Sequence, residues 1–383
     1  MNSDDHGHGA ADDIVFRLEP FPGLGQLEHL WCSLEKRAAV PFCLSWQWIG
    51  TMLAASGIEP VVLAGRRGDA IVLLALLNRS ESWRHGVLLS RRLHLNETGD
   101  PDKDIIAIEY NGFLHDACVG RDIQERALSF LMTVPDDDPL LGTWDELRLG
   151  GVPVKLERLA AEHGIRRHTI SRRGTAVVDL AAVRESGRDY LDSLGRNTRQ
   201  QIRRAIRLYE ERGPIEIEIA ATRERAAEFL DGLKHLHQRH WQARGEPGAF
   251  GYPFLVEFHR QLFARCRPGD DYELVRVRSG DDPIGFIYNF RRDNWAGYYL
   301  GGFSYETDNR IKPGLVCFAL YLQRQIEAGL DSYDFLAGDQ RYKRNLGTPE
   351  PGLVWTDLQR SRAKLKLEDA VRAARRLWHK DET

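Results

Sequence analysis

The feature that most constrains this 383-residue sequence is an order of expected elements that occurs twice. In each half, a hairpin over a Gly/Asp turn leads through further strand to a loop, a helix and a strand with an aromatic residue beside an acid. That last strand falls within residues 143–150 and again within residues 331–338. A period of about 190 residues is too long for a solenoid and favours a duplicated domain. The pattern alone also leaves an unduplicated α/β fold open, because mixed α/β chains resemble one another at this level.

The composition supports two ordinary globular cores, since 42% of the residues are hydrophobic and 28% are charged. The net charge of -3 predicts no overall attraction to nucleic acid or to an anionic membrane. The five cysteines are scattered without a Cys-x-x-Cys pair, which indicates reduced thiols. No apolar run approaches the roughly 20 residues of a membrane span, and the acidic N-terminus is unlike a secretory signal. We therefore expect a cytoplasmic protein with no membrane span.

Local patterns predict several elements that frame the rest of the argument. The polar residues 1–13 predict a disordered tail, in which His6 and His8 are solvated rather than metal-bound. Strand-like runs at 60–64 and 70–77 flank a turn and predict a hairpin, and residues 105–108 predict another strand.

A first candidate site is the segment 309–314, directly before an expected helix. Pro313 suits a first helical turn, where its missing N–H is not needed, and Gly314 lets a ligand approach the backbone. The free amides of that turn favour a phosphate or pyrophosphate, and Arg310 and Lys312 add positive charge. The alternative is an ordinary helix start with two solvated basic residues.

A second candidate is the segment 338–343, which follows an expected strand over 332–336. The carboxyl end of a strand beside a helix N-terminus is where open α/β sheets place ligands. Asp339 can accept a proton or orient an amine or hydroxyl, and Tyr342 and Lys343 can donate to developing negative charge. The alternative is a polar turn in which Asp339 caps a short helix.

The run Tyr333-Asp334-Phe335-Leu336-Ala337-Gly338-Asp339, followed by Tyr342-Lys343, resembles a signature of the GNAT acyltransferase superfamily. The signature is that of its CelD/BcsL-like branch, which is related to the Fem peptidoglycan aminoacyltransferases. The segment 297–303, the pair Pro313-Gly314 and the helix-like stretch 197–205 follow the order of that family. The resemblance is specific from about residue 190 to 350.

The resemblance implies a mixed α/β (α+β) fold of two tandem GNAT-like domains, each a mixed sheet flanked by helices. We place these domains at residues 14–175 and 188–360, joined near 170–188, with a C-terminal helix over 361–383. The active site is expected in the C-terminal domain. The implied catalytic residues are Asp339, Tyr342 and Lys343. The implied donor-binding residues are Tyr299, Leu300, Gly301, Arg310, Lys312, Pro313 and Gly314.

The implied activity is acyl transfer from acyl-CoA, with acetyl-CoA as the expected co-substrate and no metal. The acceptor would be an amine or hydroxyl of a small molecule or of a cell-envelope sugar precursor, as in polysaccharide biosynthesis. The ordinary GNAT pyrophosphate loop, Gln/Arg-x-x-Gly-x-Gly/Ala, is absent, and the Fem relatives use aminoacyl-tRNA instead. An aminoacyl-tRNA-dependent transferase therefore stays open, as does a catalytically silent scaffold in polysaccharide assembly.

A basic stripe bears on that alternative. Arg196, Arg199, Arg203 and Arg207 fall near helical spacing with Arg204 beside them. Such a stripe can contact RNA phosphates or the 3′-phosphate of a donor, although most stripes of this kind are solvated faces.

The remaining motifs favour direct transfer without a metal. His235, His237 and His240 have no companion ligands, and positions 235 and 237 do not share a helix face. No Gly-x-Ser-x-Gly nucleophile motif occurs. We expect the enzyme to align a thioester with an acceptor, and backbone N–H groups of residues 298–302 to stabilise the oxyanion.

Overall fold

The computed structural model describes residues 14–84, 88–120, 122–162 and 165–368. The expected N-terminal tail with His6 and His8 lies outside the described residues. Of the expected C-terminal helix, residues 363–368 are helical and the rest lies outside the described residues.

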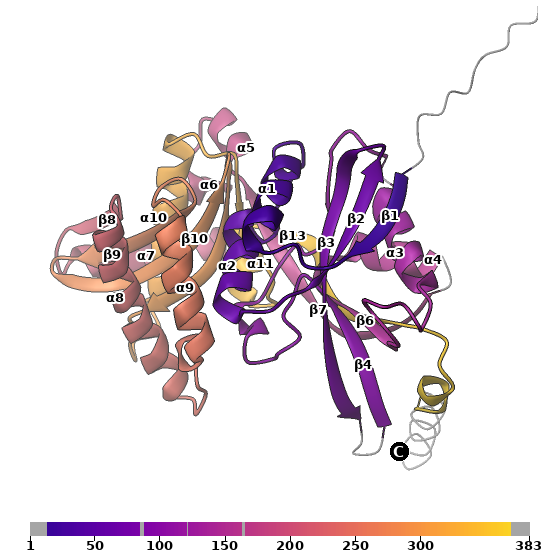
Figure 1. The fold of residues 1–383 in the computed structure, drawn as a ribbon. Coiled ribbons are helices and arrows are strands. Elements are labelled where there is room, and N and C mark those ends of the chain that lie inside the picture. Colours follow the sequence, from indigo (N-terminus) through magenta and orange to yellow (C-terminus); the bar gives the residue numbers. More distant parts are fainter. Residues whose placement is uncertain (1–13, 85–87, 121, 163–164, 369–383) are drawn as a thin grey trace, which may run out of the picture.

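A mixed sheet runs through the whole molecule (Figure 1). In the N-terminal half, four antiparallel strands lead to a strand that is parallel to the fourth. These strands are β1 (Ile14–Glu19), β2 (Val61–Arg67), β3 (Ala70–Arg84), β4 (Leu88–Leu95) and β6 (Glu146–Pro153). The C-terminal half repeats the arrangement. Its strands are β8 (Ile215–Ile219), β9 (Tyr272–Ser279), β10 (Asp282–Arg292), β11 (Trp295–Phe303) and β12 (Ser332–Asp334).

The two halves exchange their last strands at the centre of the sheet. β13 (Thr348–Gln359), from the end of the chain, pairs with β6 and β7, and β7 (Arg166–Asp179) pairs with β12. The strand order is therefore β1-β2-β3-β4-β6-β13-β7-β12-β11-β10-β9-β8. From either edge it reads as four antiparallel strands, a parallel strand and then the last strand of the other half. The sheet is continuous, yet its order has the internal symmetry expected of a duplicated fold.

The helices follow the same correspondence. Two helices follow the first strand of each half: α1 (Leu24–Glu35) and α2 (Trp46–Ser56), then α8 (Arg223–Gln242) and α9 (Pro253–Arg265). One helix precedes each parallel strand: α3 (Ile123–Thr133) and α10 (Pro313–Glu327). One precedes each exchanged strand: α4 (Val154–Glu162) and α11 (Arg341–Leu346). Between the halves lie α5 (Leu180–Glu185), α6 (Tyr190–Ser193) and α7 (Arg196–Glu210). Short pieces complete the fold: η1 (Phe42–Leu44), η2 (Asp104–Ile106), β5 (Leu114–His115) and η3 (Ala249–Gly251).

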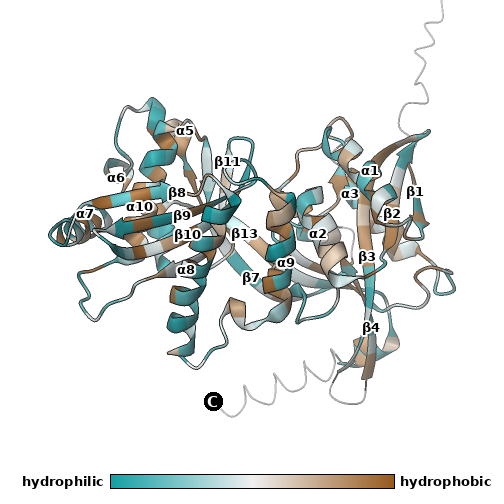
Figure 2. Cartoon of the chain, turned by 60° about the vertical axis from the view of Figure 1, so that its left-hand side comes forward, coloured by the Kyte–Doolittle hydropathy of each residue, from teal (hydrophilic) through white to brown (hydrophobic). Residues whose placement is uncertain are grey.

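An aromatic cluster packs the two halves against each other. Trp48 of α2 lies 4.8 Å from the ring of Phe258 in α9 and 5.4 Å from that of Phe290 in β10. Phe42 stacks on Phe290 at 4.3 Å. All four rings are buried, and α2 and α9 lie side by side in Figures 1 and 2. Because large aromatic surfaces are buried across the interface, the halves are held together by more than the sheet.

Two local predictions need comment. The expected strand at residues 105–108 is wrong: η2 occupies Asp104–Ile106, and Ala107 has a left-handed φ of 55°. The apolar residues there are buried by tertiary packing rather than by a sheet. The proposed domain bounds stay a prediction, and the bound at residue 175 falls within β7. Among the described helices, none is long and apolar enough to cross a membrane.

Candidate active site

A split in the sheet creates the candidate site. β11 pairs with β12 only over Trp295–Gly297, and its remaining residues stay on β10. After β12 the chain follows β7 instead, because the N–H groups of Phe335 and Gly338 donate to Ala176 and Gly174 at 2.9 Å each. The two strands therefore diverge and leave one edge of β11 open.

The open edge carries a β-bulge. Tyr288 of β10 pairs with Leu300 and the next residue, Asn289, pairs with Tyr298, so Tyr299 is the extra residue on β11. A bulge twists a strand and redirects its backbone groups. Residues 298–302, whose backbone N–H groups are expected to stabilise the oxyanion, thus lie on an open strand edge with a bulge at its centre.

A cavity of 590 Å³ fills the opening between β11 and the segment after β12. Its lining includes most of the residues that the sequence singled out. These are Tyr299, Leu300, Gly301, Lys312, Pro313, Gly314, Tyr342 and Lys343. Two predicted residues, Arg310 and Asp339, are not part of this lining.

The start of α10 forms one wall of the cavity. Pro313 is the first residue of this 15-residue helix, and no side chain caps its N-terminus. A Cβ atom at Gly314 would lie 3.6 Å from the ring of Phe303, so the backbone there is open to a ligand. The first-turn amides have no partner within the helix, which makes this end suited to a phosphate group.

The charges at the mouth are mostly paired. Arg310 binds Asp308 at 2.7 Å, and Arg212 binds Glu306 at 2.7 Å. Lys312 lines the cavity and has no ion pair within the described part of the chain. It is therefore the predicted basic residue that is available to an anionic ligand.

Lys343 lies at the base of the cavity with only 5% of its surface exposed. Its Nζ donates to the carbonyl oxygens of Leu336 and Ala337, at 3.2 and 2.8 Å. Burial lowers the pKa of Lys343, while the nearby acids Glu109 and Asp334 oppose that change. The ammonium group is thus held in place by carbonyl groups and balanced by buried acids.

Tyr342 stands beside Lys343 on the cavity wall. Its ring stacks on Phe318 at 5.6 Å, and its hydroxyl shares a hydrogen bond with Tyr298. Burial raises the pKa of Tyr342, so its hydroxyl keeps its proton at neutral pH.

Asp339 connects the site to the other half of the chain. Its Oδ1 accepts a hydrogen bond from the N–H of Gly174, in β7, at 3.0 Å. The side chain is therefore directed at the exchanged strand. No capping hydrogen bond from Asp339 to α11 is present among the described residues.

The N-terminal half supplies groups that the sequence did not reveal. Glu109 Oε2 accepts a hydrogen bond from the N–H of Ala337 at 2.7 Å. The hydroxyl of Tyr299 donates to the carbonyl oxygen of Ile106 at 3.0 Å and lies 3.2 Å from His259 Nε2. The loop after β4 thus holds both the bulge and the turn before α11. The only sequence signal for this role was the length of the connection. Residues 96–122 connect β4 to α3, whereas the corresponding connection in the C-terminal half, from β11 to α10, has only residues 304–312.

His237 of α8 is held by hydrogen bonds within the protein. His237 is buried, with Nδ1 3.0 Å from Gly301 O, and its Nε2 accepts from the N–H of Ala249 at 3.3 Å. Burial lowers the pKa of His237, which indicates a neutral ring. Together with His240, Trp241 and Arg244, it forms the α8 side of the cavity. No group of potential metal ligands is found in the described parts of the chain.

Asp334 orders the turn between β12 and α11. Its Oδ1 accepts from the N–H of Leu336 at 2.7 Å, and its Oδ2 accepts from the hydroxyl of Tyr110. Leu336 has a left-handed φ of 55°, which an ordinary side chain disfavours. Burial raises the pKa of Asp334 from 3.8 to about 6. The two hydrogen bonds therefore hold a backbone conformation that aims two carbonyl groups at Lys343.

The raised pKa of Asp334 predicts a pH effect on stability. Between pH 3.8 and about 6 the native carboxyl binds more protons than the unfolded one. The stabilisation that the protonated Asp334 gives to the native state is thus complete below pH 3.8 and is lost as the pH rises to about 6. We expect Asp334→Asn to flatten the fall in the free energy of unfolding between these pH values, measured by urea titration. Equal slopes in the two proteins would show that Asp334 does not titrate there.

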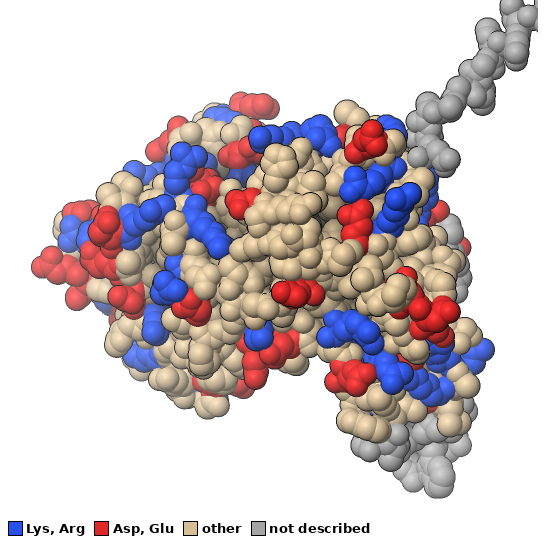
Figure 3. All heavy atoms as spheres, in the orientation of Figure 1, with Lys and Arg blue, Asp and Glu red and all other residues tan. Residues whose placement is uncertain are grey.

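The basic stripe on α7 is partly neutralised. Arg199 and Arg203 lie 3.6 and 2.9 Å from Asp192. Arg203, Arg204 and Arg207 line a shallow surface cavity on this helix. Figure 3 shows acidic and basic residues interspersed over the end of the molecule where α7 lies.

In the C-terminal half, a bulged strand thus diverges from its parallel neighbour beside the uncapped start of a helix. Residues 196–344 match the sequence family described as the acetyltransferase (GNAT) domain, and they include the cavity. The C-terminal half of the chain therefore contains a GNAT domain. No curated protein matches the chain significantly in sequence.

Solved structures extend this likeness to both halves. FemX has a TM-score of 0.57 at 13% identity, over 89% of this chain and 98% of FemX. The C-terminal domain of a putative lysylphosphatidylglycerol synthetase from Agrobacterium fabrum has a TM-score of 0.50 at 14% identity, over 91% and 97%. The L-PGS structure from Bacillus licheniformis has a TM-score of 0.50 at 11% identity, over 88% and 92%. At these identities the comparison shows a shared fold that spans the whole molecule.

Proposed function

We propose that this protein is an acyltransferase that uses acyl-CoA, with acetyl-CoA as the expected donor. The observation that carries the proposal is the bulged, open edge of β11 next to the uncapped start of α10. An open strand edge can hold the amide groups of an extended donor, and a helix start can hold its pyrophosphate. Lys312 is suited to the negative charge of that donor.

The geometry supports direct transfer to an acceptor. The amine or hydroxyl of the acceptor attacks the thioester carbonyl, and the carbon–sulfur bond breaks as the thiolate leaves. Backbone N–H groups near the bulge at Tyr299 are suited to the oxyanion, and the Nζ of Lys343 lies 6.0 Å from the ring of the neighbouring Tyr298. Tyr342 keeps its proton, so it can protonate the departing thiolate.

The acceptor in this proposal is a small molecule or a cell-envelope sugar precursor. The α8 side of the cavity offers Trp241 and Arg244, and Tyr305, which follows β11, packs against His240 of α8. Aromatic faces pack against sugar or other apolar surfaces, and Arg244 suits an anionic group. A cytoplasmic location and a role in polysaccharide biosynthesis remain predictions from the sequence.

A Fem-like aminoacyl-tRNA donor is the second candidate. The basic face of α7 favours it. The hydrogen bond from Arg310 holds the pKa of Asp308, at the cavity mouth, below its ordinary value, and the charge of Arg204 on α7 adds to that effect. A nucleic-acid phosphate chain can follow such a face toward the site. Calorimetry separates the candidates. Binding of coenzyme A supports the acyl-CoA enzyme, and binding of tRNA supports the Fem-like enzyme. If neither molecule binds, a silent scaffold is supported.

Gly314 gives the sharpest test of the donor site. We expect Gly314→Val to weaken coenzyme A binding by more than about 1 kcal/mol, because a branched side chain blocks approach to the first helical turn. The fold should tolerate the change, since a Cβ atom there makes only ordinary contacts. Isothermal titration calorimetry with coenzyme A provides the measurement.

Gly195→Val serves as the matched control for this test. Gly195 precedes α7, and a Cβ atom there meets nothing within 4 Å. Its coenzyme A affinity should equal that of the wild type. If folded Gly314→Val also binds normally, the donor site lies elsewhere.

Asp339 remains a proposed base for the acceptor. Its position also allows a purely structural role, and an experiment can distinguish the two. Its bond to Gly174 ties the turn before α11 to β7. If Asp339 acts as a base, Asp339→Asn should lower turnover by about 100- to 10,000-fold with little change in donor affinity. A lower melting temperature with normal turnover per folded molecule would make Asp339 structural.

A further inference from the structure

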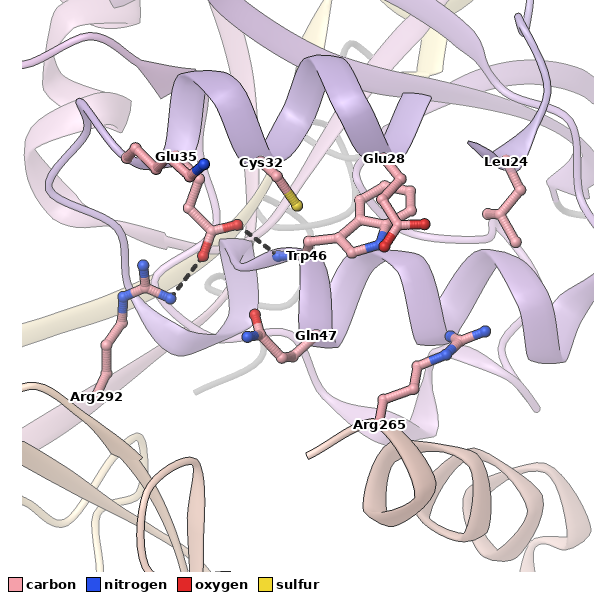
Figure 4. A pocket seen from close by; sticks show the side chains of 9 residues that line it. Leu24, Glu28, Cys32, Glu35, Trp46, Gln47, Arg265 and Arg292 are labelled. Atoms are coloured by element: carbon pink, nitrogen blue, oxygen red, sulfur yellow. Dashed lines mark hydrogen bonds and ion pairs between the residues drawn. The ribbon is translucent and has the colours of Figure 1, made fainter. Parts of the chain in front are cut away.

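A second cavity lies between the two halves and is lined by none of the residues of the proposed acyl site. It has a volume of 510 Å³. Its walls come from α1, from the start of α2, from the end of α9 and from the end of β10 (Figure 4). The cavity is therefore built by both halves and belongs to neither alone.

Some of its charges are already satisfied within the protein. Glu35 binds Arg292 at 2.8 Å and accepts a hydrogen bond from the N–H of Trp46 at 2.9 Å. This arrangement joins α1, α2 and β10 and fixes one side of the cavity. Glu35 and Arg292 are thus part of the frame.

Charges of both signs remain available. Within the described residues, none of Glu28, Lys36 and Arg265 forms an ion pair, although all three line the cavity. Arg265 is anchored by a hydrogen bond from Nη1 to Thr51 Oγ1 at 3.2 Å. Figure 4 shows Glu28 directed down from α1 and the Arg265 guanidinium directed up from the end of α9, into the same space.

An unpaired amide oxygen adds a further polar group. Gln47 Oε1 is buried and has no hydrogen-bond partner. A buried acceptor without a donor destabilises the folded state, because the group has lost its hydrogen bonds to water. Figure 4 shows this oxygen turned toward the cavity, where Trp46 and Leu24 supply apolar surface. A ligand N–H group could satisfy it.

We propose that this cavity binds a zwitterionic small molecule of the α-amino acid class. The ligand carboxylate would meet Arg265, and the ligand ammonium group would meet Glu28 and the oxygen of Gln47. A simple anion leaves Glu28 without a partner and a simple cation leaves Arg265 and Lys36 without one, whereas a zwitterion meets charges of both signs. This proposal does not depend on whether the acyl site binds acyl-CoA or aminoacyl-tRNA.

The test uses the full chain and the standard L-amino acids as probes, one at a time, at millimolar concentration. Binding to the native state raises the melting temperature. We expect at least one amino acid to do so, and its affinity is then measured by calorimetry. Its amide, which lacks the carboxylate, and its N-acetyl derivative, which lacks the ammonium, should each bind at least about tenfold more weakly.

Variants connect that binding to the cavity. Glu28→Gln and Arg265→Gln should each lower the affinity at least about tenfold. Glu59→Gln, an exposed acid outside the cavity, should bind like the wild type. The proposal is overturned if no amino acid raises the melting temperature, if the blocked derivatives bind equally well, or if the two cavity variants keep full affinity.

Discussion

Turnover should fall by about 100- to 1,000-fold when Lys343 is replaced by methionine, because the cavity loses the positive charge that we place near the oxyanion. Methionine has nearly the same length, so the packing of the side chain is largely kept. The measurement is the rate of acyl transfer under saturating donor, normalised to folded protein. Normal turnover would exclude Lys343 from the chemistry.

The same substitution has a separate cost in stability. Without Lys343, the acids Glu109 and Asp334 lose a positive neighbour, which leaves negative charge buried. We expect the double variant with Glu109→Gln to regain stability and not turnover. Arg344→Met removes an exposed positive charge from the same helix and should change neither.

The second large effect concerns the packing of α8 on the open strand. A Cβ atom at Gly302 would lie 2.4 Å from the carbonyl oxygen of Leu233, so α8 approaches β11 backbone to backbone. Gly302→Ala should therefore lower the free energy of unfolding by roughly 1–3 kcal/mol, because the helix must move away. Denaturant titration measures this change.

Gly314→Ala is the matched control, because its Cβ atom has room at 3.6 Å from the nearest atom. It should change stability by less than about 0.5 kcal/mol. If Gly302→Ala proves equally harmless, α8 does not pack as closely on β11 as the structure has it.

Much of the fold followed from local signals. The hairpin at β2 and β3 has a Gly/Asp turn between two apolar runs. The pair Trp144-Asp145 directly precedes β6, and the pair Tyr333-Asp334 lies within β12. These patterns depend on neighbours in the sequence, which is why they are readable without coordinates. The exchange of β7 and β13 gave no such signal, because strand partners are chosen by long-range packing.

The candidate site divides in the same way. Pro313, Gly314, Tyr342 and Lys343 come from two segments with recognisable local patterns, and the structure brings all four to one cavity. Arg310 carried the same kind of signal, but it is paired with Asp308 and does not itself line the cavity. A basic residue beside a helix start is visible in a sequence, but its choice between an ion pair and a ligand site is not.

The sequence by itself predicted a GNAT domain in the C-terminal half, the duplicated order of elements and the segments that line the candidate site. Only the tertiary structure showed that the N-terminal half completes that site, through Glu109 beside Lys343 and through Ile106 beneath Tyr299. The physical reason is distance along the chain. A turn or a helix start is encoded by adjacent residues, whereas a hydrogen bond across nearly two hundred residues exists only once both halves have packed.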